Sequence, residues 1–161
     1  MARDAGAAGW RFLFREEGGT IDAATWRRGF LALAAPMLVM TLIWFALLPY
    51  ANRDLDERQL FDPMALVVYA YLLVYAAAIF LAAVSFYFLS SKRWRDLGKP
   101  ASFAGLPLLA GLVAGSAAWL QPRVSEDMPW AIVGGFDVVL LAVVVWHAGA
   151  LGLGASKAGA P

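Results

Sequence analysis

Four uninterrupted apolar runs constrain the fold of this chain more than any motif does. They cover residues 29–50, 64–89, 103–120 and 130–151. A helix rises about 1.5 Å per residue, so about 20 residues cross a hydrocarbon core about 30 Å thick. Lipid offers no hydrogen bonds to free backbone groups, and the runs show no strand-like alternation. The sequence therefore predicts an all-α integral membrane protein with four transmembrane helices.

The composition supports the same class of protein. Of the 161 residues, 61% are apolar and only 16% are charged, and the mean hydropathy is +0.65, which is unlike a soluble domain. The first run is too long for the core of a cleavable signal peptide, so we expect it to be retained. The predicted organisation is an interfacial N-terminal segment over residues 1–28, a four-helix domain over 29–151 and a flexible tail over 152–161.

Lys and Arg are distributed unevenly among the segments that connect the runs. Ten lie in the N-terminal segment, the second connection and the C-terminal tail, namely Arg3, Arg11, Arg15, Arg27, Arg28, Lys92, Arg93, Arg95, Lys99 and Lys157. Three lie in the other two connections, namely Arg53, Arg58 and Arg123. Because short cytoplasmic segments carry the excess of positive charge, both termini and the second connection are predicted to be cytoplasmic.

The second connection, S-K-R-W-R-D-L-G-K-P-A-S over residues 91–102, has an ordered pattern as well as a high charge. Its cations can anchor topology and contact anionic lipid headgroups, at about 1 kcal/mol each. Gly98 followed by a proline is typical of a helix end, a turn and a new helix start. Asp96 can pair with Arg93 or Arg27, or it can cap the third helix. We expect Arg93, Arg95 and Asp96 to tie the second and third helices to the N-terminal segment.

Two short motifs resemble a known family. R-W-R-D-L-G-K-P-A in the second connection and G-T-I-D-A-A-T-W over residues 19–26 are similar to motifs of small bacterial inner-membrane proteins of the YhaH type. Thr20 and Ala23 stand where that family has Arg, so Arg27 or Arg28 would have to replace them. The resemblance implies a four-span helical protein of the bacterial inner (cytoplasmic) membrane, and it implies no activity.

The N-terminal segment contains two local signals. W-R-F-L-F-R over residues 10–15 mixes aromatic and basic residues, which is typical of a membrane interface, although a docking site for a partner is also compatible with it. Thr20 or Asp22 is a suitable N-cap for a helix that continues through Trp26 into the first span. Pro36, inside that span, predicts a kink.

Asp137 is the only carboxylate well inside an apolar run. It lies seven residues from Trp130, about 10 Å along a helix. Polar side chains expected at the same depth on the other helices are Thr41, Trp44, Tyr69, Tyr71 and Ser116. Asp137 can form a hydrogen-bond clamp between the fourth and second helices, a proton or cation relay, or a contact with a partner subunit.

Two other features inside the spans are candidates for structural roles. His147, the single histidine, falls near the cytoplasmic end of the fourth helix, where we expect an interfacial hydrogen bond. Gly111 and Gly115 form a G-x-x-x-G pattern that Ala118 extends, and such small faces let helices approach closely, either within the chain or against another subunit.

Several chemistries have no residues to support them. The chain has no cysteine and one histidine, and it shows no phosphate-binding glycine motif and no nucleophile beside a base. We therefore expect no catalytic residue, cofactor, metal site or nucleic-acid partner. The favoured function is a non-catalytic accessory subunit or assembly factor of a larger membrane complex, of respiratory or photosynthetic type, in contact with lipids and partner subunits. The alternative is a small oligomeric transporter or channel that uses Asp137.

Overall fold

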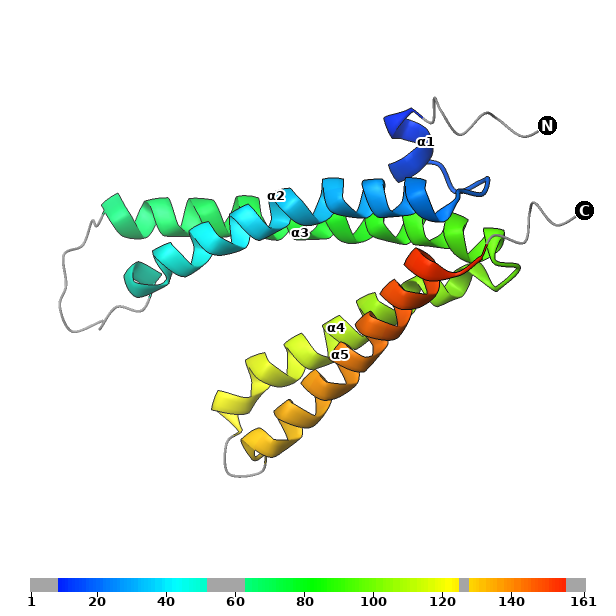
Figure 1. The fold of residues 1–161 in the computed structure, drawn as a ribbon. Coiled ribbons are helices and arrows are strands. Elements are labelled where there is room, and N and C mark those ends of the chain that lie inside the picture. Colours follow the sequence, from blue (N-terminus) through cyan, green and yellow to red (C-terminus); the bar gives the residue numbers. More distant parts are fainter. Residues whose placement is uncertain (1–8, 52–62, 125–127, 156–161) are drawn as a thin grey trace, which may run out of the picture.

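The computed structural model describes residues 9–51, 63–124 and 128–155, and this part of the chain contains helices and connections but no strand (Figure 1). The elements are α1 (Trp10–Phe14), α2 (Ala23–Ala51), α3 (Pro63–Asp96), η2 (Ala101–Gly105), α4 (Leu106–Leu120), η3 (Gln121–Arg123) and α5 (Trp130–Leu153). Four helical segments are long and apolar enough to cross a membrane, with α4 counted together with its flanking 3-10 turns. The all-α fold with four spans is confirmed.

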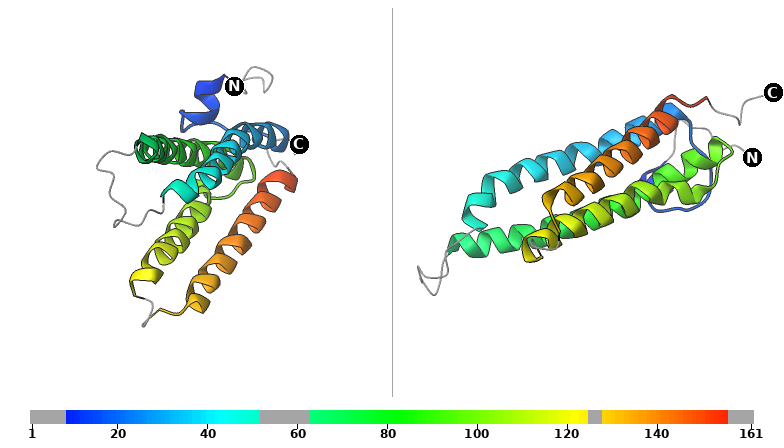
Figure 2. Two further views of the ribbon diagram at one scale, coloured as in Figure 1. Left: turned by 90° about the vertical axis from the view of Figure 1, so that its left-hand side faces the viewer. Right: turned by 90° about the horizontal axis from the view of Figure 1, so that it is seen from below.

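The four long helices form two antiparallel pairs that meet at one end only. α2 packs along α3, and α4 packs along α5. The pairs approach each other where α2 begins, α3 ends and α5 ends, and they diverge toward their other ends (Figures 1 and 2). We call the shared end the junction and the diverging ends the open ends. The first and last described residues both lie at the junction, as an even number of spans requires, and which side of the membrane it faces stays a prediction.

The core of the molecule lies at the junction. Its buried apolar side chains come from α1, α2, α3, η2, α5 and the segment before α2, namely Phe14, Ile21, Trp26, Leu89, Trp94, Ala104 and Leu151. Toward the open ends, by contrast, all four long helices expose large apolar side chains, among them Leu42, Phe45, Leu66, Leu73, Leu112, Val138 and Leu141. Such a surface is stable in lipid and would be unfavourable in water.

Two helix boundaries differ from the predicted spans because the helices continue beyond the apolar runs. α3 extends to Asp96 because the polar residues from Ser90 onward, except the half-buried Arg95, are buried at the junction. It ends in a Schellman motif, in which the Lys99 N–H donates to the Trp94 carbonyl at 2.9 Å and Gly98 has a positive φ of 67°. Glycine adopts that conformation without steric cost, so the predicted turn at Gly98 is confirmed.

α2 also begins before the predicted span, at Ala23. Asp22, rather than Thr20, caps it: Asp22 Oδ1 accepts a hydrogen bond from the Thr25 N–H at 2.9 Å. α2 then continues through Pro36 as one helix. The preceding α1 packs on α3 through the buried Phe14, so the aromatic face of residues 10–15 is partly used within the chain.

Candidate functional site

Lys92 lies at the centre of the junction and is completely buried. Its ammonium group donates to three backbone carbonyls, those of Leu13 and Phe88, both at 3.4 Å, and that of Glu16. An ammonium group has three N–H donors, so its hydrogen-bonding capacity is filled. The Phe12 ring centre lies 5.3 Å from Nζ and adds a cation–π contact. Lys92 therefore fastens the α1 segment to α3.

Arg93, also completely buried, fastens the end of α5 to α3. Its Nε donates to the Leu151 carbonyl at 3.0 Å, and its Nη2 donates to the Gly154 carbonyl. The last carbonyls of a helix have no partner within the helix, so Arg93 satisfies groups that α5 leaves free. Its Nη1 pairs with the Asp96 carboxylate. Of the partners predicted for Asp96, the structure shows Arg93.

The predicted tie to the N-terminal segment involves both arginines, since the charge of Arg93 also helps to lower the pKa of the Asp22 carboxyl. Arg95 makes the direct hydrogen bond, since its Nη1 donates to the Gly19 carbonyl at 3.0 Å, whereas the hydrogen bonds of Arg93 described above reach the end of α5. Trp26 adds a tie between α2 and α3, because its indole N–H donates to Ser90 Oγ at 3.3 Å. Arg27 and Arg28 are exposed.

His147 lies in the aromatic part of the junction, between Phe86 and Trp94 of α3, with ring-centre distances of 5.4 and 5.5 Å. It is only 2% exposed. Neither of its ring nitrogens has a hydrogen-bond partner among the described residues, and the same holds for the Trp94 indole nitrogen. The predicted interfacial hydrogen bond of His147 is wrong, because the histidine is enclosed by aromatic rings.

The polar side chains within the α2–α3 pair bond to each other and not to Asp137. The Thr41 and Tyr75 hydroxyl groups are 2.7 Å apart, and Thr41 donates to the Met37 carbonyl at 2.8 Å. The Tyr71 hydroxyl donates to the Met40 carbonyl at 2.5 Å. These contacts hold α2 against α3.

The predicted clamp between Asp137 and the second helix is therefore wrong. Asp137 is exposed on α5, and no described residue forms a hydrogen bond or ion pair with it. Its depth, about 10 Å below the start of α5, lies inside the hydrocarbon layer. An unpaired carboxylate there costs about 2.5 to 3.5 kcal/mol on insertion scales.

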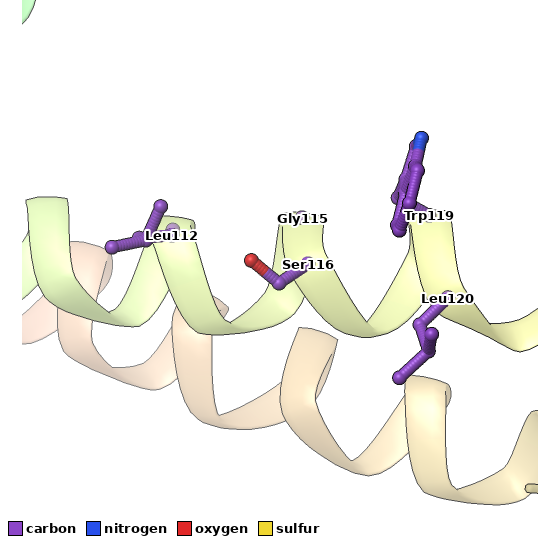
Figure 3. A pocket seen from close by; sticks show the side chains of 6 residues that line it. Leu112, Gly115, Ser116, Trp119 and Leu120 are labelled. Atoms are coloured by element: carbon purple, nitrogen blue, oxygen red, sulfur yellow. The ribbon is translucent and has the colours of Figure 1, made fainter.

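A shallow groove of about 470 Å³ follows one face of α4 near its open end. Gly111, Leu112, Gly115, Ser116, Trp119 and Leu120 line it, and Trp119 stands at one end of it, on the side away from α5 (Figure 3). The two glycines differ in their surroundings. A Cβ on Gly111 would lie 3.9 Å from Leu140 Cδ1, whereas a Cβ on Gly115 would meet nothing within 4 Å. The G-x-x-x-G face is thus only partly used inside the chain.

No family model, no curated protein and no solved structure matches the chain. The resemblance to the YhaH-type family therefore stays a prediction.

The structure separates the predicted site residues into two groups. At the junction it brings together Asp22, Trp26, Arg93, Arg95, Asp96, Gly98 and His147. On the α4–α5 pair it leaves Gly115 and Asp137 uncovered. The sequence assigns Lys92 only a role as a topology anchor and does not indicate that it fastens the α1 segment to α3. The available signal for this role was the position of Lys92 at a helix end, between two serines and an arginine.

Proposed function

We propose that the chain is a non-catalytic integral membrane subunit that packs against transmembrane helices of a larger assembly. The observation that carries the proposal is the uncovered G-x-x-x-G face of α4. Small residues are used in membranes where helix backbones approach closely, yet a Cβ at Gly115 would meet nothing within 4 Å. A helix from another subunit can occupy the groove that this face forms.

The contacts at the junction also support the proposal. Its buried cations have their donors directed at backbone carbonyls and at Asp96, and its histidine is enclosed by aromatic rings. These contacts fasten helices together, as expected of a scaffold. A small transporter or channel has less support, because a single exposed carboxylate does not form a polar path through the chain.

The experiment is gentle detergent extraction of the tagged protein from its native membrane, followed by native electrophoresis and mass spectrometry of co-migrating proteins. We expect a stoichiometric partner. Migration of the wild-type protein alone, or as a small homo-oligomer, would contradict the proposal.

Gly115→Leu and Gly134→Leu form a matched pair for the same experiment. A Cβ at either position meets nothing within 4 Å, so both positions border open space in the single chain. Of these two positions, only Gly115 lines the groove. We expect Gly115→Leu to remove the partner and Gly134→Leu to retain it. Equal retention by both variants would exclude the groove as the docking surface.

A further inference from the structure

Asp137 lies on an uncovered surface of α5. Val133, one turn before it on the same helix face, is buried, but Asp137 itself is exposed, and the next residue, Val138, is 67% exposed. No described residue is bonded to the carboxylate. A charged side chain inside a membrane is nearly always paired with a partner group. The structure of the single chain therefore leaves this carboxylate without the partner that its location requires.

Within residues 9–51, 63–124 and 128–155, the chain supplies no cation at this depth. Two contacts define how α4 and α5 lie side by side: Gly111 stands opposite Leu140, and Gln121 Nε2 donates to the Met128 carbonyl at 3.3 Å. Arg123 therefore stands near the level of Met128, nine residues from Asp137 and about 13 Å away along the helix axis. That exceeds the reach of an arginine side chain.

Arg123 is also engaged elsewhere. Its guanidinium carbon lies 3.8 Å from the centre of the Trp119 ring, and its Nη1 donates to the Trp119 carbonyl at 2.5 Å. The other Lys, Arg and His residues of the described spans lie toward the junction, namely Arg27, Arg28, Lys92, Arg93, Arg95 and His147. A second copy with the same orientation in the membrane places its cations at these same depths. None of the cations in the described part of that copy reaches the level of Asp137 either.

From this mismatch of charge and depth we propose that Asp137 is the docking contact for a transmembrane helix of a different protein, one that carries a Lys or Arg at the same depth. The proposal rests on the proposed function and names the chemistry of its partner. Two opposite charges that meet in lipid attract strongly because the surroundings screen them little. Asp137 selects its partner by charge, whereas the groove on α4 accepts a helix by shape.

The test uses the complex extracted from native membranes and three single variants of this chain. Asp137→Glu keeps the charge, and Asp137→Asn keeps the size and removes the charge. Val138→Asn places a new polar group on the adjacent exposed position. We expect Asp137→Glu and Val138→Asn to retain the partner, and Asp137→Asn to lower its recovery by at least about tenfold, as expected for loss of one member of a desolvated charge pair. Retention by Asp137→Asn at the wild-type level would overturn the proposal.

A charge exchange completes the test. The partner, once identified by mass spectrometry, must have a Lys or Arg about two helical turns below the same membrane surface, and a partner without one would overturn the proposal. Changing that residue to Asp should abolish recovery, and combining it with Asp137→Lys should restore it. A complex that is lost in Gly115→Leu but unaffected by Asp137→Asn would overturn this inference and leave the proposed function in place. Absence of any partner of the wild-type chain would contradict the proposed function itself.

Discussion

The junction and the open ends of the helix pairs differ in whether their charged side chains have partners within the described chain. At the junction, Lys92 and Arg93 are completely buried, and their charged groups donate to backbone carbonyls and to Asp96. Toward the open ends, Asp137 is exposed on α5 and bonds to no described residue. The surfaces around it carry exposed Val and Leu side chains.

This difference indicates which part of the molecule is complete by itself. Removing one partner of a buried charge is costly, because the other partner is then left buried and unpaired. The junction is a closed set of contacts, so changes there should affect folding. An open end with an uncovered glycine face and an unpaired carboxylate has little effect on the fold of the chain. Changes there should affect association.

The largest expected effect is that of Arg93→Met. The substitution leaves the buried Asp96 carboxylate without its ion pair and the Leu151 and Gly154 carbonyls without their donors. We expect a loss of about 3 to 5 kcal/mol in the free energy of unfolding, measured by denaturation in SDS–detergent mixtures. The double variant Arg93→Met, Asp96→Leu should lose less than the sum of the two single changes. Additive losses would show that the pair does not act as a unit.

Gly29→Leu should have the next largest effect. A Cβ at Gly29 would lie 2.8 Å from Leu89 Cδ1, so a larger side chain forces α2 away from α3 at the junction. We expect a loss of about 1 to 3 kcal/mol, typical of overpacking, in the same unfolding measurement. Gly115→Leu at the open end is the matched control and should leave the unfolding midpoint unchanged. Equal destabilisation by the two variants would remove the distinction between the two ends.

The sequence predicted the features of the fold that depend on local chemistry or on the bilayer. Four long apolar runs in lipid have no structure open to them except helices. The turn at Gly98 and the Asp22 cap depend on residues within a few positions of each other. The contacts of Arg93 with α5 could not be predicted in this way, because its acceptors are backbone carbonyls about 60 residues along the chain. Every residue type offers such an acceptor.

The error at Asp137 has a different physical origin. Counting residues from the membrane surface gave its depth, but depth does not determine how a helix is rotated about its own axis. Two of the candidate partners, Thr41 and Tyr71, bond within the α2–α3 pair instead. The rotation of α5 depends on the packing of α4 against it, through contacts such as Gly111 with Leu140.

Asp22→Ala tests the edge of the junction, where α2 begins. The pKa of the Asp22 carboxyl lies below its ordinary value, because hydrogen bonds from the side chain and backbone of Thr25 favour the charged form. The cap therefore contributes fully to the free energy of unfolding above the ordinary carboxyl pKa of about 4. This contribution is lost as the pH falls through the lowered pKa that Asp22 has in the folded state. We expect Asp22→Ala to cost about 1 kcal/mol at pH 7 and to flatten the acid dependence of the unfolding midpoint. An acid dependence identical to that of the wild-type protein would contradict this role of the cap.

Tyr75→Phe should have the smallest effect, and it examines the contacts that lie between the junction and the open end. Thr41 uses its single proton on the Met37 carbonyl, so the 2.7 Å contact between the two hydroxyl groups is donated by Tyr75. Hydrogen bonds between membrane helices contribute about 0.6 kcal/mol on average, and we expect a loss of that size in SDS unfolding. Tyr69→Phe is the control, because Tyr69 is 65% exposed and should show no loss. A loss several times larger at Tyr75 would mean that this contact holds α2 and α3 together as firmly as the junction does. The difference between a closed junction and an open end would then apply only to the α4–α5 pair.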